Sequence, residues 1–502
     1  MQSVRTGFFI LLCIFCCSVK SQLVWNNTYI EGRPLLLFSS ILKENNFYYL
    51  TGVTFDSSNS NSYNRVYLCK IDLSGVVVNQ SCFYTNLNKD YGAFHNTLIK
   101  NKSENFVLTG YERDALNRLF IAEFDANIDS VIVHEYYTPN TYLFAGKKII
   151  QDMDGDYFVS GIRTDSGQSR ANVVLVRLDS AGNKKWEKNY GGVLYESGSS
   201  MIKLNNGNLM LGAVRNDLGQ PVEHANTWLL EVDTGGNIVR QWFDPNDSTY
   251  AAEGLLQTQD GGFVYGAQKK FDQTVNAVYK TATIVKTDSL FNKEWVFNDG
   301  SRSEVTGIFD LQELPDGSII GCGNKPFYKN DSSTLSGWIV KLAADGSVIW
   351  NKTYIGLTGP FSYNYLTDVD VQSDGSIIAV GQSQKNGNTP PQVGWFLKLD
   401  SNGCEMENCL LSITEPFSSL QINIYPNPAG DYVMLGFGED NNSRENEELE
   451  VFNGVGQRTY YSQLFPNTDA IKIETSAWAN GLYYVAIKRN GIHIKSGKFI
   501  KE

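Results

Sequence analysis

Short apolar runs, each preceded by a polar turn and ended by Gly or Ala, recur seven times along the chain. Residues 155–161 (GDYFVSG) and 375–381 (GSIIAVG) are two of them. The seven runs end at Gly52, Gly110, Gly161, Ala213, Ala267, Gly323 and Gly381. Successive ends are 51 to 58 residues apart. A repeat of this length is one supersecondary unit that cannot bury both of its faces alone, so the pattern predicts units that stack on their neighbours.

A second apolar run keeps step with the first. Its copies end at Asp72, Asp125, Asp179, Asp233, Asp288, Ala343 and Asp400. A Gly- or Asn-containing turn follows, and then a run that often carries Trp, as at Trp186 and Trp350. All these runs are short and rich in β-branched and aromatic residues, as strands are. The Asn-Gly and Asp-Gly pairs between them are typical of tight hairpins. Each unit therefore predicts four short antiparallel strands, and no segment shows a sustained helical period.

Seven such units predict an all-β fold, with a seven-bladed β-propeller over residues 22–410. Residues 25–29 (WNNTY) match residues 350–354 (WNKTY), which belong to a fourth strand. The last unit lacks a fourth strand of its own, because residues 401–404 follow without a Trp. We therefore expect the N-terminal strand to complete the last blade and close the ring, which would leave only short strand edges. The Trp side chains are expected to pack between blades.

Residues 1–21 begin with a segment that contains Arg5, continue with a short apolar run and end in small and polar residues. This pattern predicts a cleaved secretory signal peptide. The apolar run is too short for a comfortable membrane span, and no transmembrane span is expected in the mature chain. Cys16 and Cys17 raise a lipoprotein alternative, which the bulky Ile14 and Phe15 before them disfavour.

Five cysteines remain after the signal peptide. Cys69 and Cys82 fall on two consecutive strands of the first unit, at near-symmetric positions about the turn, and we expect a cross-strand disulfide between them. Cys404 and Cys409 could close a small loop at the exit of the last unit. Both pairings fit an oxidising compartment. Cys322 lies in an apolar run and is expected to be a buried thiol.

The repeat stops near residue 420, after an expected linker over 411–419. Residues 422–428 (INIYPNP), 450–456 (EVFNGVG), 478–485 (WANGLYYV) and 497–501 (GKFIK) then follow in order. Together these motifs closely resemble the C-terminal sorting domain (type A) of the type IX secretion system, over residues 420–502. The resemblance rests most on Pro426, Asn427, Pro428, Gly456, Gly481, Tyr483 and Lys498.

The resemblance implies a small Ig-like β-sandwich that serves as an export address in Bacteroidetes-type bacteria. The implied partners are the outer-membrane translocon and its sorting peptidase, and the implied location is secreted or attached to the cell surface. The pattern of the residues agrees, because short alternating strands are separated by polar turns and the two prolines cannot lie inside a central strand. An accessory Ig-like domain with a binding role of its own is the alternative.

Charge and motifs exclude several classes of function. The net charge is −12 with no basic block, which argues against nucleic acid as a partner. The four histidines are far apart without metal-ligand spacing, and no hydrolase elbow, zinc-protease or phosphate-loop motif occurs. We expect no catalytic set, metal or cofactor. The spacing from Gly182 to Trp186 is similar to that of tryptophan-docked quinoprotein propellers, but no vicinal Cys pair supports a quinone.

Residues 152–156 (DMDGD) suggest calcium, but they occupy a hairpin-turn position and lack the distal bidentate Glu. A turn is the favoured interpretation. Glu196, Glu253, Glu304 and Asp368 fall where blades would converge around an axis. Glycoside hydrolysis needs two carboxylates at a defined separation. Whether any of these acids form such a pair, or are solvated loop acids, stays open.

The connections differ in length in a regular way. The first–second and third–fourth strand joins are short turns, whereas the others are long and emerge together on the opposite face. Variable loops on a rigid scaffold are where sites are usually built. Aromatic residues in these long connections are the candidate ligand contacts, because exposed rings suit sugar or peptide faces. The candidates are Tyr91, Phe94, Tyr142, Tyr195, Tyr250, Phe361 and Tyr363. Packing between blades is the alternative role for the same rings.

The sequence therefore predicts a secreted or cell-surface protein that acts as a binding or adhesion module for glycan, peptide or protein through its long-loop face. The alternative is a secreted polysaccharide- or peptide-degrading enzyme that uses acidic residues on that face. A purely structural envelope component is a third class.

Overall fold

The chain divides into two compact units, residues 1–407 and 408–502. The computed structural model describes residues 24–30, 35–56, 63–83, 89–113, 117–168, 170–192, 196–216, 225–244, 249–270, 280–299, 306–329, 332–359, 361–385, 391–405, 422–436, 447–454, 457–464, 470–489 and 492–502. These residues form strands and turns without a helix. No helix that could cross a membrane occurs in this described part of the chain. The expected signal peptide and linker lie outside it.

Four-stranded antiparallel groups follow one another along the first unit. The first is β2 (Leu36–Glu44), β3 (Phe47–Asp56), β4 (Tyr63–Asp72) and β5 (Val77–Phe83). In the second, β6 (Asp90–Ala93) and β7 (Ile99–Lys100) both pair with β8 (Phe106–Arg113), followed by β9 (Asn117–Phe124) and β10 (Val131–Tyr136). The third is β11 (Thr141–Gln151), β12 (Tyr157–Asp165), β13 (Asn172–Leu178) and β14 (Lys184–Tyr190).

The fourth group is β15 (Glu196–Lys203), β16 (Leu209–Asn216), β17 (Ala225–Val232) and β18 (Ile238–Phe243). The fifth is β19 (Thr249–Gln257), β20 (Phe263–Lys270), β21 (Lys280–Thr287) and β22 (Lys293–Asn298). An eight-stranded sheet follows. One half is β23 (Gly307–Glu313), β24 (Ile319–Lys329), β25 (Ser332–Leu342) and β26 (Val348–Tyr354). The other half is β27 (Tyr363–Val371), β28 (Ile377–Gln384), β29 (Gln392–Leu399) and β1 (Trp25–Tyr29). A single parallel bridge from Leu335 to Tyr363 joins the halves.

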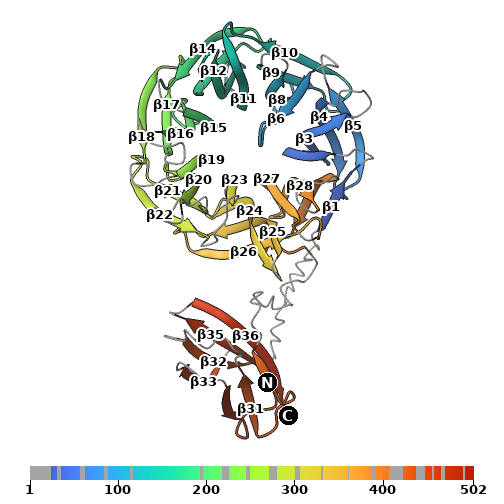
Figure 1. The fold of residues 1–502 in the computed structure, drawn as a ribbon, viewed down its shortest axis with the longest axis vertical. Helices are drawn as coiled ribbons and strands as arrows, with labels where there is room; N and C mark the ends of the chain where they lie inside the picture. The colour runs from blue at the N-terminus through green and yellow to red at the C-terminus, as the bar shows by residue number, and fades with distance from the viewer. Residues whose placement is uncertain are drawn as a thin grey trace, which may run out of the picture. The chain divides into compact units, whose positions relative to one another are not determined.

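Figure 1 shows these groups arranged around a centre, with β6, β11, β15, β19, β23 and β27 nearest to it. We call the first strand of each group, β2 included, an inner strand. The last strand of each group, with β1 in the eight-stranded sheet, is an outer strand. Long-range backbone pairing places β1 beside β29, with Trp25 opposite Lys398 and Tyr29 opposite Gly394. The N-terminal strand therefore supplies an outer strand to the last group.

Four outer-strand tyrosines tie their groups to a turn in the next group. The hydroxyl of Tyr190 donates to the carbonyl of Gly236 at 2.8 Å, and that of Tyr354 donates to Gly403 at 2.9 Å. On β1, Tyr29 makes the same contact with Gly75 of the first group at 2.8 Å. Such turn glycines have positive φ, and their missing Cβ leaves room for a Trp of the neighbouring group. The pairs are Gly75 with Trp25, Gly236 with Trp186, Gly346 with Trp295 and Gly403 with Trp350.

The first and last groups share a hydrophobic core. Phe38 of β2 and Tyr67 of β4 cluster with Val380 of β28 and Phe396 of β29, all buried. Burying apolar area in this way is the main favourable contribution to folding. The ends of the strand array are therefore packed together by the same kinds of contact that join its interior groups.

Removing the hydroxyl of Tyr29 should weaken this junction. The Tyr29→Phe variant should lose about 0.5–1.5 kcal/mol of unfolding free energy, because the carbonyl of Gly75 loses its donor in a half-buried setting. Tyr142→Phe is the matched control, since Tyr142 is exposed on the first unit. Urea unfolding of the two variants measures the difference. Equal midpoints would contradict a stabilising role for the hydrogen bond.

The repeated glycine is explained by an irregularity in the inner strands. Pairing of β11 with β12 shifts register between Gly146 and Lys148, a β-bulge. The same kind of shift occurs in the inner-strand pairings of the first, fourth and fifth groups and of both halves of the eight-stranded sheet. At the bulge, a carbonyl turns toward the second strand. A Cβ on Gly161 would lie 1.9 Å from the carbonyl oxygen of Ala145, so only glycine fits at this position of the third group. The fourth and fifth groups carry Ala213 and Ala267 at the corresponding motif position, beside register shifts of their own.

The second unit consists of two antiparallel sheets over one core. One sheet has the order β30 (Asn423–Tyr425), β31 (Tyr432–Gly436), β34 (Ala470–Glu474). The other has the order β33 (Arg458–Leu464), β32 (Glu447–Asn453), β35 (Gly481–Arg489), β36 (Ile492–Lys501). Val433 and Ile473 of the first sheet pack in one buried cluster with Val451, Val485 and Phe499 of the second. This arrangement agrees with the sandwich that the sequence motifs imply.

The expected Cys69–Cys82 disulfide is not formed, and both residues are thiols in the structure. The register places Cys69 opposite Gln80 and Cys82 opposite Tyr67, so the two thiols occupy diagonal positions. Diagonal Cβ atoms are too far apart for the Cβ separation of about 3.5–4.5 Å that a disulfide requires. Cys404 is disulfide-bonded, and Cys409, its expected partner, lies outside the described residues. Cys322 is a buried thiol, as expected.

Candidate functional site

The candidate site lies where the inner strands converge. The second group differs from the others there, because residues 94–98 interrupt its inner strand between β6 and β7. This segment is fixed to β2 by two hydrogen bonds. The amide of Asn96 donates to the carbonyl of Ser39 at 3.0 Å, and the amide of Thr97 donates to the Ser40 hydroxyl at 2.8 Å. Asn96 has a φ of 51°, in the left-handed region where Asn is tolerated.

The Asn96 side chain connects strands from several groups. Its Nδ2 donates to Oδ1 of Asp310 on β23 at 2.7 Å. Lys148 on β11 donates from Nζ to the Asn96 carbonyl at 2.7 Å and also to its side-chain oxygen. We call Asn96, Lys148, Asp310 and Asp368 the axial network. It links the 94–98 segment to inner strands far from it in sequence.

Asp310 and Asp368 form a buried carboxyl pair that shares a hydrogen bond. Asp368 accepts the amide of Ile41 at 2.7 Å, and Asp310 accepts the amide of Val369 at 3.2 Å. Burial, and then the neighbouring Asp310 charge, raise the pKa of Asp368 well above its usual value. Burial also raises the pKa of Asp310 and lowers the pKa of Lys148. We infer that the pair holds one proton, donated from Asp368 to Asp310.

This shared proton predicts a pH dependence of stability. The folded state keeps a proton on Asp368 that the unfolded chain releases above about pH 3.9. Stability should therefore fall as pH rises from there toward the raised folded-state pKa, by at most about 1.4 kcal/mol per pH unit. In Asp368→Asn, the amide can accept from Ile41 and donate to Asp310 without titrating. Urea unfolding at pH 5 to 8 should show a smaller fall in unfolding free energy for Asp368→Asn than for the parent. The exposed control Asp154→Asn should behave as the parent does. Equal pH slopes would contradict the shared proton.

Beside the network is a hollow midway along the inner strands, with about 60 Å³ of space open to water. We call it the axial hollow. It is lined by Phe94, His95, Asn96, Lys147, Lys148, Ser200, Met201, Glu253, Gly254, Leu255, Phe309 and Asp310. His95 is exposed to solvent in the hollow and contacts the Phe309 ring at 5.6 Å. Desolvation by the surrounding protein, and then the charge of the Lys147 ammonium, lower the pKa of His95 to about 4. His95 is therefore neutral at neutral pH.

The charged groups of the hollow include Lys147 and Glu253. Lys147 lies over the Phe94 ring, with Nζ 4.5 Å from the ring centroid. Burial lowers the pKa of Lys147 and raises the pKa of Glu253, and each charge partly offsets the shift of the other. Within the described part of the chain, neither side chain has an ion pair or hydrogen bond.

The aromatic candidates are divided among different environments. Tyr91 is fully buried in the core and donates to Glu135 at 3.2 Å, which fits the packing alternative. Phe94 lies in the axial hollow. Tyr142 and Phe361 are 59% and 52% exposed, at the long-connection ends of inner strands. Tyr363 is half-buried beside Tyr365, with ring centroids 6.3 Å apart. Tyr195 lies outside the described residues, and Tyr250 is described only as a position on β19.

The acidic candidates do not form one site. Asp368 joins the axial network and Glu253 lines the hollow, whereas Glu196 is buried near Arg215, 3.5 Å from its guanidinium. Glu304 lies outside the described residues. Four residues here were not among the candidates predicted from the sequence: Asn96, Lys147, Lys148 and Asp310. One signal was present, because Lys148, Asp310 and Asp368 each lie 13 residues before the Gly that ends the apolar run of their unit.

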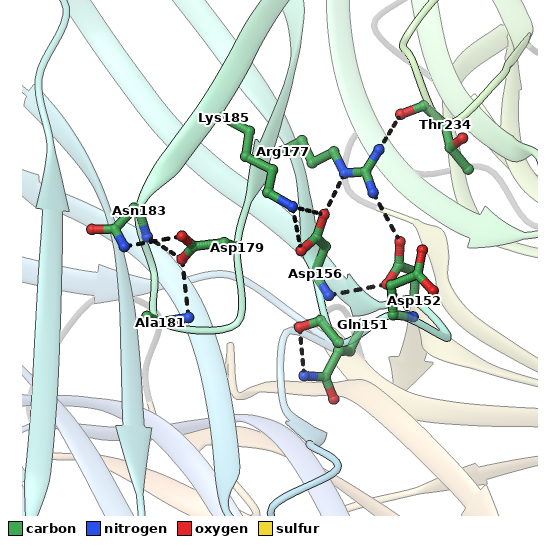
Figure 2. A network of polar contacts seen from close by, with 11 residues as sticks. Gln151, Asp152, Asp156, Arg177, Asp179, Ala181, Asn183, Lys185 and Thr234 are labelled. Atoms are coloured by element: carbon green, nitrogen blue, oxygen red, sulfur yellow. Dashed lines mark hydrogen bonds and ion pairs between the residues drawn. The ribbon is translucent and has the colours of Figure 1, made fainter.

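Residues 152–156 form a turn held by ion pairs, as Figure 2 shows. Oδ1 of Asp152 accepts the amides of Asp154 and Asp156 at 2.8 and 3.0 Å. Asp156 is bound by Nε of Arg177 at 2.7 Å and by Nζ of Lys185. Both acids are thus occupied by protein donors, and the described residues contain no cluster of three or more potential metal-binding side chains. The turn interpretation, not the calcium one, fits this geometry.

Arg177 also donates to the carbonyl of Thr234 at 3.0 Å, in the turn before β18 (Figure 2). The Asp156–Arg177 pair therefore joins the third group to the fourth. Burial opposes ionisation of Asp156, but Lys185 and Arg177 outweigh it and lower the pKa of this carboxyl. The network has a structural role between neighbouring groups.

The sorting-motif residues gather around the end of the last strand. Oδ1 of Asn427 accepts the amide of Ile500 at 2.9 Å, between Pro426 and Pro428, both of which follow cis peptide bonds. Tyr483 is buried and stacks on Phe499 with centroids 5.5 Å apart. Lys498 is exposed and Gly481 has a φ of 152°. Gly456 lies outside the described residues.

Comparison with known proteins identifies this second unit. Residues 423–502 match the family described as the secretion system C-terminal sorting domain. The chain thus carries a type IX sorting domain, which indicates secretion to the cell surface or the extracellular space. Recognition by the type IX secretion machinery follows from the same match. No curated protein matches the chain significantly.

Solved structures with similar folds share little sequence with the chain. PorZ, a surface component of the type IX secretion system of Porphyromonas gingivalis, is 11% identical, with 95% of this chain and 70% of PorZ covered and a TM-score of 0.32. The β-propeller domain of the Trilobed protease from Pyrococcus furiosus is 10% identical, with 75% and 94% covered and a TM-score of 0.38. Puromycin hydrolase is 11% identical, with 82% and 60% covered and a TM-score of 0.46. The arrangement of the first unit's strand groups around a centre is propeller-like (Figure 1).

Proposed function

We propose that the first unit is a seven-bladed propeller closed by β1, and that the exported protein binds a ligand through its long-loop face. Dividing the eight-stranded sheet at its single parallel bridge, and counting β6 and β7 as one interrupted inner strand, would make seven blades of four strands each. Closure is supported by the Tyr29–Gly75 hydrogen bond and the core shared by the first and last groups. A closed ring would offer a rigid scaffold for the long connections.

One observation favours binding over catalysis. The carboxyl pair that comes closest to a catalytic dyad, Asp310 and Asp368, is engaged by Asn96 and by two backbone amides. A general acid or base must be able to reach the proton that it transfers. The exposed rings of Tyr142 and Phe361, in contrast, are available for sugar or peptide faces at the ends of the inner strands.

The test uses the purified mature chain on glycan and peptide arrays, together with assays of reducing-sugar and amine release. Selective binding without turnover is expected. Tyr142→Ala and Phe361→Ala should each weaken it by about tenfold, a loss of about 1.4 kcal/mol, and the exposed turn variant Lys102→Met should not. Turnover would support the degradative enzyme instead, and silence in every assay would overturn the binding proposal in favour of a structural envelope component.

A further inference from the structure

We propose that the axial hollow is a binding site for a small zwitterion such as a free α-amino acid. The proposal builds on ligand binding by the first unit but concerns a different site from the exposed rings. It begins with Lys147 and Glu253, which line the same hollow and carry opposite charges. Each influences the pKa of the other, yet the described residues provide neither with an ion pair or hydrogen bond. Both side chains are half-buried, and charges withdrawn from water in this way are normally paired.

The charge balance selects the ligand class. An anion beside Lys147 would be repelled by Glu253, and a cation beside Glu253 would be repelled by Lys147. A ligand with both charges can place its carboxylate at Lys147 and its ammonium at Glu253, so both protein charges gain a partner. The other charged groups that line the hollow, Lys148 and Asp310, are already joined through Asn96. They leave the hollow close to neutral overall.

The size of the hollow selects a small member of this class. A cavity needs about 10–15 Å³ for each water molecule, so the hollow of about 60 Å³ holds roughly four to six waters. Glycine and alanine have about that number of heavy atoms, whereas a hexose has roughly twice as many. Phe94 and Phe309 line the same space and provide an apolar surface for a short side chain. The exposed His95 shows that solvent reaches the hollow.

The pairing also predicts an unusual stability pattern. Replacing a half-buried charge that lacks an ion pair by a neutral side chain of similar shape removes part of a desolvation cost. Lys147→Met and Glu253→Gln should therefore fold normally, with an unchanged or raised Tm in the absence of ligand. Binding residues often destabilise the ligand-free protein, so replacing them can raise its stability. A residue that served only structure would show the opposite change.

The experiment measures binding of glycine and L-alanine to the mature chain by calorimetry and by thermal shift at pH 7. Glycine or alanine should raise the Tm, while acetate and methylammonium, each with one charge, should bind at least tenfold more weakly. Lys147→Met and Glu253→Gln should each lose at least tenfold in affinity, whereas Lys102→Met and Glu104→Gln, on an exposed turn, should bind as the parent does.

Three results would overturn the proposal: no heat and no thermal shift with either amino acid, equal binding of acetate, or full binding by both neutral variants. A lower Tm for the two neutral variants without ligand would also count against unpartnered charges. Array binding that depends on Tyr142 and Phe361, with no amino-acid binding, would leave the proposed function intact and remove only this site. Amino-acid binding without array binding would support the axial hollow as a site and overturn ligand binding through the long-loop face.

Discussion

Replacing Gly161 by Ala is expected to lower the unfolding free energy of the first unit by about 3 kcal/mol. The new Cβ would lie 1.9 Å from the carbonyl oxygen of Ala145, 2.9 Å from its carbon and 3.1 Å from Cα of Gly146. All three atoms belong to the backbone of β11, so no side-chain rotation can relieve the contact. Either β11 moves away from β12, or the bulge at residue 147 is lost.

A second consequence follows from the position of the bulge. Lys147 and Lys148 lie at this irregularity, so relaxing it should disturb the axial hollow and the contact of Lys148 with Asn96. Gly192→Ala is the matched control, because nothing lies within 4 Å of its added Cβ and its φ is not positive. That control should change stability by less than about 1 kcal/mol. Denaturant unfolding compares the two, and equal unfolding midpoints would contradict the steric explanation of the repeated glycine.

The repeat of strands could be predicted because its signals are local. Turn residues and apolar runs fix where each strand begins and ends, and the match between residues 25–29 and 350–354 correctly indicated that β1 is an outer strand. The structure adds the reason for the glycine in the motif, which is a carbonyl of another strand. The glycine is visible in the sequence but its cause is not, because a bulge depends on the register of two paired strands.

Register also decided the errors. Cys69 and Cys82 were placed on the correct strands, but the register sets Cys69 opposite Gln80 and Cys82 opposite Tyr67, so the two thiols are diagonal to each other. Tyr91 was a candidate either for ligand contact or for packing between blades, and its position on β6 with the ring in the core fits the packing role. Side chains alternate between faces of a strand, so an offset of one residue converts an exposed ring into a buried one.

The contacts of the axial network could not be predicted from the sequence for a different reason. Asn96 and Asp310 are 214 residues apart, and their contact exists only because the inner strands converge. No local pattern distinguishes Asn96 from the many asparagines in turns. The acids were expected near an axis, but which of them approach each other depends on the arrangement of the whole unit. The structure pairs Asp368 with Asp310, which was not among the candidates.

Deleting residues 420–502 is expected to abolish export to the cell surface while leaving the first unit folded. The two units have separate cores, and the buried cluster of the second draws no residue from the first. Domains with their own core can in principle fold alone. The deleted protein should therefore keep the Tm of the first unit but accumulate inside the cell envelope, as measured by surface proteolysis and fractionation. Surface levels should fall to the background of the assay.

Two point variants separate the fold of the tail from its exposed motif. Phe499→Ala removes a fully buried ring that stacks on Tyr483, and should cost the second unit about 3–5 kcal/mol and most of its export. Lys498→Ala changes an exposed neighbour and should leave the core intact, so any export defect in it reports recognition by the secretion machinery.

Fusion of residues 420–502 to an unrelated periplasmic reporter should carry that reporter to the surface. The fusion should work because the second unit has a core of its own and can be transferred as a folded domain. Unchanged surface levels after the deletion, or a fusion that stays inside the cell envelope, would contradict the assignment of export to this unit.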